Sequence, residues 1–600
     1  MGKSFGLFAI LLLLLCAQSC GDDENLPAIT VSTETLDFPS GKSTLELEVS
    51  ATREWKIRAD ASWCTILGAG VVNEPCKGKV LTIKADENNS LKERETTVTI
   101  SETGGSVRTV TVRQRAADEL APRFKSFRFR ATANPGKLPE DVGLTIAGTR
   151  LSARTSFVVE DKVLVPEFEF DGGKVYAGMQ EVVSGKTEMD FSGLVVLTIR
   201  NKSGAEKEYT VDLISFTGLP VVYIDTKGVP IDSKEVYVPA TIRIVDNNGQ
   251  RASSIFEETV NIKGRGNSTW LMPKKPYRLK FDKKQSLLGE PKDKSWVLLA
   301  NYMDDDCGMR NATAYSIGHL SCMDFTPTVH FVEVFLNGRH NGLYQLCEHM
   351  KISEDRVNVT DEGYLIEAEQ RDDEEQTGDV YFWAETAEPE VRLRFCIKDP
   401  DVEKGSPAYD RIRDYVNEAQ NALYGPDFKD PEKGYAKYLN VDTYVDWYVI
   451  SEITKTNDAA LYTSCYMNIA PGGKLNMGPM WDYDICIGNS RWNGDGSTDG
   501  YWNRHSPWFA RMLEDPVFVQ KVKERIRYFK ANLPAVLERM DVNAEYVGLS
   551  VVEDNRLWEM LGPKETEDGL VRSAFLQDVQ GMKNWLTARL DWLDQASFRD

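Results

Sequence analysis

Histidine is scarce in this chain of 600 residues and C-x-x-C cysteine pairs are absent, which excludes several kinds of catalytic site. The five histidines are scattered, and neither the HExxH pattern of zinc peptidases nor the GxSxG pattern of serine hydrolases occurs. No two cysteines have the C-x-x-C spacing, so a zinc site is not expected. Cys64 and Cys76 could form a disulfide in an oxidising compartment or remain buried free thiols. The sequence leaves both possibilities open.

Basic tracts are missing as well, and the formal net charge is −21. Because nucleic acids bind proteins through positively charged patches, we expect no nucleic-acid partner. Long apolar runs are confined to the first 20 residues, and nothing after them approaches the roughly 18 apolar residues of a membrane helix.

The first 20 residues, MGKSFGLFAILLLLLCAQSC, contain one lysine, an apolar run and small residues before a cysteine. This pattern is typical of a secretory signal. Residues 17–20 resemble a bacterial lipobox, with Ala17 where leucine is usual, and the acidic residues 22–24 resemble the export tag of surface lipoproteins in Bacteroidetes.

The resemblance implies a lipoprotein signal peptide over residues 1–19, lipidation of Cys20, and an acidic tether over residues 20–25. The membrane would then be contacted through the lipid anchor only. The expected location is the outer membrane, facing the cell surface or the periplasm. Ordinary signal cleavage, which would release a secreted product, is the alternative.

Two segments, residues 26–116 and 122–217, alternate polar and apolar residues in short runs, which is typical of all-β sandwiches. In the first segment Trp55, Trp63, Arg94 and the closing residues 112–114 resemble the BACON domain, a small Ig-like module. That resemblance implies either glycan binding or a spacer. The second segment is predicted to be another Ig-like sandwich without catalytic residues, so the two together would form a stalk.

Strands alternate with helices from residue 219 onward, and we expect one large α+β domain over residues 219–600. Met582, Trp585, Leu586, Arg589, Leu590 and Leu593 recur at helical spacing. This stripe predicts a helix face that packs into the core.

An acidic pattern between residues 444 and 489 is the strongest sign of chemistry. An apolar helical run ends at Asn457–Asp458, and after a Gly472–Gly473 turn a short strand is predicted to carry Asp482 and Asp484. Alternate residues of a strand project to the same side, so these two carboxylates could face one point, with Asp458 as a third. Hard oxygen donors of this kind suit Mg²⁺ or Mn²⁺.

Five motifs occur in order, at residues 262–270, 274–281, 296–311, 333–348 and 457–484. Together they resemble the CotH family of spore-coat kinases, which have an atypical protein-kinase fold. The resemblance therefore implies a multidomain chain: two N-terminal all-β Ig-like sandwiches followed by a kinase-like α+β domain. It also implies ATP or another nucleotide as the phosphate donor.

The resemblance assigns roles to particular residues. Gly264, Arg265 and Gly266 would form a turn over the nucleotide phosphates, and Lys280, with Arg278 as its rival, would pair with phosphate oxygens. Glu348 would lie beside the nucleotide cleft or form a structural salt bridge. The catalytic residue would be Asp458, which would orient or deprotonate the acceptor hydroxyl. The metal would be held by Asp482 and Asp484.

Other features of this domain are expected to have structural roles, and one of them bears on whether the kinase-like domain is active. Arg310 is expected in an internal ion pair, and Asn337–Gly338 predicts a hairpin turn. Residues 495–500 resemble the start of a calcium loop, but Ser506 stands where its glutamate should be, so an ordinary loop is expected. Many active relatives read Pro-Trp-Asp, whereas here Met480 is inserted before Trp481–Asp482, which fits either an intact metal geometry or an inactive kinase.

Three functions remain open. The first is a metal-dependent kinase acting on an unknown protein or glycan acceptor, although ATP is scarce outside the cytoplasm. The second is an inactive kinase-like platform for adhesion to glycan or protein. The third is a glycoside hydrolase, whose carboxylates must lie about 5–9.5 Å apart. Alternate residues of a strand are about 6.5–7 Å apart, so distance alone does not exclude it.

Overall fold

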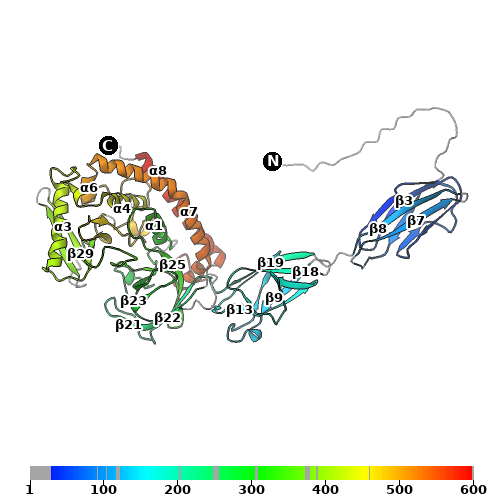
Figure 1. The fold of residues 1–600 in the computed structure, drawn as a ribbon, viewed down its shortest axis with the longest axis horizontal. Coiled ribbons are helices and arrows are strands. Elements are labelled where there is room, and N and C mark those ends of the chain that lie inside the picture. Colours follow the sequence, from blue (N-terminus) through cyan, green and yellow to red (C-terminus); the bar gives the residue numbers. More distant parts are fainter. Residues whose placement is uncertain are drawn as a thin grey trace, which may run out of the picture. The chain divides into compact units, whose positions relative to one another are not determined.

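The computed structural model describes residues 29–596, apart from residues 89, 91, 103–104, 117–121, 202–204, 247–255, 305–307, 372–378, 387–389 and 459. An all-β region comes first along the chain and an α+β region follows, as the sequence predicts (Figure 1). The predicted signal peptide, Cys20 and the acidic tether lie outside the described residues.

The first β region contains two four-stranded sheets around one apolar core. One sheet has the order β1 (Ile29–Val31), β3 (Ser43–Ala51), β6 (Cys76–Ala85), β5 (Cys64–Leu67). The other has the order β2 (Thr35–Phe38), β8 (Val107–Gln114), β7 (Arg94–Glu102), β4 (Trp55–Ala59). Trp55 is fully buried in the core. Cys64 and Cys76 are both free thiols, and burial raises the pKa of Cys64.

The second β region begins with an aromatic strand, in which Phe124, Phe127 and Phe129 are all buried. This strand, β9 (Arg123–Phe129), pairs in a sheet with β10 (Val142–Gly143) and β14 (Pro166–Asp171), and η1 (Ala131–Ala133) follows it. A six-stranded sheet has the order β11 (Thr145–Ala147), β12 (Arg150–Arg154), β19 (Glu206–Ile214), β18 (Val195–Arg200), β15 (Lys174–Ala177), β16 (Gln180–Val182). The short strands β13 (Val163–Leu164) and β17 (Met189–Asp190) pair with each other.

The α+β region starts with a closed barrel. Its order is β20 (Val221–Asp225), β21 (Val238–Val245), β22 (Phe256–Gly264), β23 (Tyr277–Gln285), β24 (Asp293–Leu299), β26 (Arg339–Glu348), β25 (Val329–Leu336), with η3 (Thr269–Leu271) between β22 and β23. The predicted hairpin at Asn337–Gly338 joins β25 to β26, and both residues have positive φ, 50° and 76°. These are the dihedrals that a two-residue hairpin turn requires.

A five-stranded sheet and the helices share the largest core. The sheet has the order β28 (Val380–Thr386), β29 (Val391–Asp399), β27 (Tyr364–Ala368), β30 (Cys465–Ile469), β31 (Asn476–Met477). The helices are α1 (Arg310–Gly318), α3 (Pro407–Tyr424), η4 (Tyr435–Lys437), α4 (Val441–Thr454), α5 (Ser490–Asn493), α6 (Pro507–Met512), α7 (Pro516–Trp558) and α8 (Asp568–Ala596). Two of them begin with a proline after a capping side chain, Ser406 for α3 and Asp515 for α7.

Helix α8 lies against α7 (Figure 1). The predicted stripe of α8 is buried as expected, and its Arg589 pairs with Glu452 of α4. Within the described residues, no helix combines the length and the apolarity needed to cross a bilayer.

Candidate functional site

A cavity of about 510 Å³ in the α+β region brings together most of the residues predicted to do chemistry. Its lining comes from the turn after β22, the ends of β27 and β29, the start of β28, the segment after α4 and the turn after β31. The lining residues are Arg265, Gly266, Asn267, Ser268, Thr269, Glu367, Glu369, Arg371, Asp379, Tyr381, Lys398, Asn457, Asp458, Tyr462, Thr463, Ser464, Tyr466, Trp481, Asp482, Asp484 and Ile485.

Local geometry requires glycine at positions 264 and 266 of the turn after β22. A side chain at Gly264 would collide with the Trp270 ring, and Gly266 has a φ of 81°, which disfavours other residues. The Arg265 guanidinium lies 5.4 Å from the centroid of the Trp481 ring. The turn therefore brings backbone and one cation to the wall of the cavity.

The segment of Asp482 and Asp484, residues 481–484, is a turn and not the predicted strand, and it is called the acidic turn below. Residues 481–484 lie outside any strand, and Asp482 has a φ of 64°. The Tyr483 N–H donates to Asn311 Oδ1 of α1 at 2.8 Å, and the Asn489 amide donates to the Asp484 carbonyl at 3.1 Å. These tertiary hydrogen bonds favour a turn over strand pairing. The expectation of a strand is wrong, yet both carboxylates line the same cavity.

Asp458 lies in the segment that follows α4. The C-cap residue of that helix, Lys455, has a left-handed backbone conformation. The Asn457 N–H donates to the Ile485 carbonyl at 3.0 Å, and the Ile487 N–H donates to the Thr454 carbonyl at 2.7 Å. These two hydrogen bonds join the segment of Asp458 to the acidic turn.

The carboxylates of this site influence one another: Asp484 is buried, and Asp458 and Asp482 are half-buried in the same cavity. Burial and then the neighbouring Asp482 raise the pKa of Asp458 to about 7. Burial raises the pKa of Asp484 well above its ordinary range, and the Asp482 and Asp304 carboxylates raise it further. Buried like charges of this kind favour either protonation or a bound cation.

The donor chemistry suits a hard divalent cation, although the arrangement differs from the prediction of three carboxylates on one ion. Among the described residues, no group of three or more His, Cys, Asp or Glu side chains is arranged to hold a metal. Mg²⁺ commonly binds through one or two carboxylates, with water and substrate phosphates completing its shell. Asp482 and Asp484 line the same cavity and would be the two carboxylates available to such an ion.

Several charged residues of the cavity escaped the sequence prediction. Lys398 of β29 lies with its Nζ 3.0 Å from Asp379 Oδ2 and 3.5 Å from Glu367 Oε2. Burial lowers the pKa of Lys398, but Glu367 and the other ionisable groups around it together outweigh this, and the net shift is upward. One signal in the sequence could have indicated Glu367 and Glu369. They alternate in the stretch YLIEAEQ (residues 364–370), and alternate residues share one face of a strand.

Arg371 and Glu369 form a further ion pair of the lining, with Arg371 Nε 2.9 Å from Glu369 Oε1. The Thr463 hydroxyl donates to the other oxygen of Glu369 at 2.9 Å.

The lining does not include Gly264, Arg278, Lys280, Glu348 or Arg310, which were also singled out from the sequence. Lys280 is exposed on β23, with its Nζ 5.9 Å from the Tyr237 ring, and Arg278 is half-buried on the same strand. Glu348 is buried at the end of β26, where its carboxylate accepts a hydrogen bond from the Thr328 N–H at 2.8 Å, and burial raises its pKa. Arg310 forms the expected internal ion pair, with its Nη1 2.5 Å from Asp304 Oδ1.

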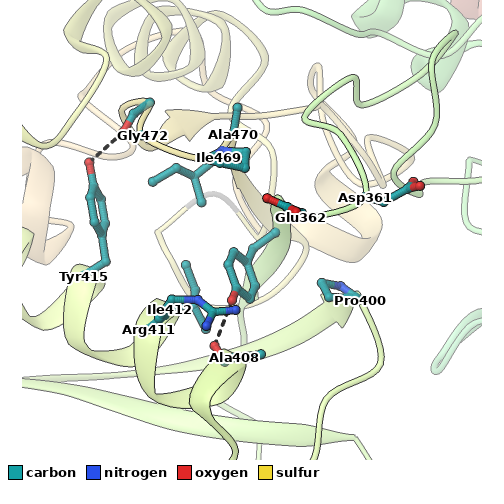
Figure 2. Close-up of a pocket in the computed structure, with 13 residues that line it drawn as sticks. Asp361, Glu362, Pro400, Ala408, Arg411, Ile412, Tyr415, Ile469, Ala470 and Gly472 are labelled. Carbon is teal, nitrogen blue, oxygen red and sulfur yellow. Dashed lines mark hydrogen bonds between the residues drawn. The ribbon is translucent and has the colours of Figure 1, made fainter.

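A larger cavity of about 810 Å³ lies between β27, α3 and the turn after β30 (Figure 2). The hydroxyl groups of its two tyrosines are engaged with backbone carbonyls, Tyr364 with Ala408 at 2.9 Å and Tyr415 with Gly473 at 3.2 Å. Its charged residues, Asp361, Glu362 and Arg411, are exposed. The charged residues converge in the smaller cavity, which is therefore the candidate site.

Comparison with protein families identifies two regions. A model described as "CotH kinase protein" matches residues 262–593, more than half of the chain. A model described as "Putative binding domain, N-terminal" (BACON) matches residues 53–115. No curated protein matches the chain.

Solved structures give only weak likenesses. A Bacteroides ovatus GH5 xyloglucanase in complex with a XXXG heptasaccharide is 25% identical over 16% of this chain and 20% of its own, with a TM-score of 0.14. The Pseudomonas aeruginosa CupB2 chaperone is 13% identical over 30% of this chain and 98% of its own, with a TM-score of 0.13. Such low TM-scores carry no functional argument.

Proposed function

The chain belongs to the CotH kinase family, and from that premise we propose that it transfers a phosphoryl group from ATP or another nucleotide to a hydroxyl of a protein or glycan. The observation that carries the proposal is the cavity that Asp458, Asp482 and Asp484 line together with the Gly266 turn. Phosphoryl transfer needs these parts: a carboxylate for the acceptor, carboxylates for a metal, and backbone close to the phosphates.

Each residue has a distinct task in this proposal. Asp482 and Asp484 would hold Mg²⁺ or Mn²⁺, which when bound neutralises charge on the phosphates. Asp458, whose pKa is about 7, is suited to orient the acceptor hydroxyl and accept its proton near neutral pH. Arg265 and Lys398 are better placed for phosphate oxygens than Lys280, because both line the cavity and Lys280 does not.

The same proposal extends to architecture and location. Residues 26–116 and 122–217 would be two Ig-like modules, and residues 219–600 a kinase-like domain. Cys20 would carry the lipid that attaches the protein to the outer membrane, facing the cell surface or the periplasm.

The test uses the purified protein with labelled ATP, Mg²⁺ or Mn²⁺ and a generic protein acceptor. Asp482→Asn should abolish transfer by removing a metal ligand. Asp458→Asn should slow transfer by about 10²–10⁴-fold while nucleotide binding stays nearly unchanged, because its role is on the acceptor side. Transfer that survives Asp482→Asn would show that the site is elsewhere.

A second candidate is an inactive kinase-like platform that binds a glycan or a protein. It is favoured by the inserted Met480 and by the lack of a three-ligand metal group among the described residues. This candidate predicts no transfer by the unaltered protein, and no heat of nucleotide binding in calorimetry with Mg²⁺.

A further inference from the structure

The ammonium group of Lys455 lies inside the loop formed by residues 495–500. Its Nζ is 2.9 Å from Asp495 Oδ2, 3.2 Å from Ser497 Oγ and 2.6 Å from the Asp499 carbonyl. Only 2% of the Lys455 side chain is exposed. A buried ammonium requires acceptors for its three hydrogens, and the loop supplies three.

The loop has the residue spacing of a cation-binding loop. Asp495, Ser497, Asp499 and Gly500 match positions 1, 3, 5 and 6 of a calcium loop, whereas the glutamate of position 12 is missing. The Ser497 N–H donates to Asp495 Oδ1 at 2.8 Å, which curls the loop around its centre. The lysine ammonium occupies the place where such a loop directs its oxygens.

The loop is also fixed from outside by helix α8. Arg589 Nη1 donates to the carbonyls of Thr498 and Gly500 at 2.9 and 2.6 Å, and the Trp585 indole donates to the Gly496 carbonyl at 2.8 Å. These hydrogen bonds engage carbonyls other than the Asp499 carbonyl that faces Lys455. The loop is therefore a preformed receptor for the ammonium.

Lys455 connects this receptor to the predicted catalytic residue. It ends α4 with a φ of 47°, and Asp458 follows three residues later. The Trp502 indole donates to the Thr456 carbonyl at 2.6 Å, and the Asn457 N–H donates to the Ile485 carbonyl at 3.0 Å. The segment is thus held to the loop region on one side and to the acidic turn on the other.

We propose that Lys455 is a positioning residue: it is the built-in cation of the loop of residues 495–500 and so sets the position of Asp458. The part that concerns catalysis rests on the proposed function of Asp458. The loop itself needs no metal while the lysine is present. Removing the ammonium leaves oxygen donors spaced for a hard cation, so Lys455→Ala should acquire a site for Ca²⁺ or a lanthanide.

Terbium luminescence tests the loop in the full-length protein. Lys455 Nζ lies 5.7 Å from the Trp502 ring, so a bound Tb³⁺ there should be sensitised by tryptophan. Lys455→Ala should gain emission over the unaltered protein, and Ca²⁺ should displace it. The matched control, Lys455→Ala with Asp495→Asn, should lose that gain, because it lacks the Asp495 carboxylate. The acidic turn is intact in all three proteins, so any Tb³⁺ bound there adds the same emission to each. Equal emission from all three would overturn the proposal.

Hydrogen exchange measured by mass spectrometry tests the positioning. Peptides that contain residues 455–458 should exchange about tenfold faster in Lys455→Ala and in Asp495→Asn, because each breaks a partly exposed ion pair. Ca²⁺ should restore protection in Lys455→Ala but not in the double variant. Asp495 is half-buried at the surface, so it can be replaced without disturbing the core, and unchanged exchange in a folded Asp495→Asn protein would also overturn the proposal.

Kinetics add a readout that a purely structural role would not give. In Lys455→Ala kcat should fall about tenfold with the nucleotide KM unchanged, and Ca²⁺ should recover part of it. If the unaltered protein transfers no phosphate, the proposed function fails, while luminescence and exchange still decide the role of Lys455.

Discussion

Met480 shows how the chain accommodates the residue inserted before the acidic turn. Its side chain is fully buried, and it packs where Gly318 of α1 has no side chain. A Cβ at Gly318 would collide with the Met480 sulfur and lie 3.0 Å from Thr326 Cγ2. The insertion is therefore absorbed by the core, while Asp482 and Asp484 remain at the cavity.

Gly318→Ala should lower the free energy of unfolding by about 1–3 kcal/mol, because it overpacks a buried site. Urea denaturation measures the change. Gly581→Ala is the control: Gly581 lies in α8 with nothing within 4 Å of an added Cβ, so alanine should stabilise by roughly 0.5–1 kcal/mol. Combining Gly318→Ala with Met480→Ala should recover much of the loss, and equal effects of both alanines would contradict this account.

Asn311 is the residue that fixes the acidic turn from outside it. Asn311→Ala removes the acceptor of the buried Tyr483 N–H and should cost about 1–3 kcal/mol in unfolding free energy. It should also weaken Mg²⁺ binding in calorimetry, since Asp482 and Asp484 flank that N–H. Ser316→Ala on the same helix, which loses only a bond to its own helix, should leave Mg²⁺ binding unchanged. Identical Mg²⁺ affinities in the two variants would refute the role of Asn311.

At the scale of elements, the sequence predicted those helices and turns that depend on neighbouring residues alone. The Asn337–Gly338 hairpin and the buried stripe of α8 follow from turn dihedrals and helical spacing, and both are confirmed. The strand expected at residues 481–484 is wrong because its backbone bonds to Asn311, which is far away in sequence. Lys398 was missed for the same reason: only the fold brings β29 to the cavity.

Helices α4 and α8 are joined by a buried ion pair between Glu452 and Arg589, at 2.9 Å. Arg589→Met should destabilise the protein by about 3–5 kcal/mol, because it leaves the Glu452 carboxylate buried without its cation. Arg556→Met, which breaks the exposed pairs of Arg556 in α7, should cost at most about 1 kcal/mol. Denaturant unfolding compares the two, and similar losses would show that burial is not the deciding factor.

At the scale of the whole molecule, an all-β region with a match to a binding-domain model precedes a kinase-family region on one chain with a net charge of −21. The sequence alone sufficed for this order of regions, since alternation of apolar residues and family motifs are properties of the chain. It could not supply the contents of the cavity, which come from six separate segments.

Acylation of Cys20 is the prediction that concerns the molecule's location. Metabolic labelling with a fatty-acid analogue should tag the unaltered protein and miss Cys20→Ala, because the lipid would be carried by this thiol. Cys16→Ala, which removes the neighbouring cysteine of the same segment, should still be labelled. Labelling of Cys20→Ala at the level of the unaltered protein would refute the anchor.

The attachment of the 495–500 loop to Arg589 has a consequence for biogenesis. A nascent chain that has reached residue 500 contains every residue of the cavity, but the helix that clamps the loop behind Asp458 has not yet been made. The clamped form of the site can therefore be completed only after α8 has been synthesised.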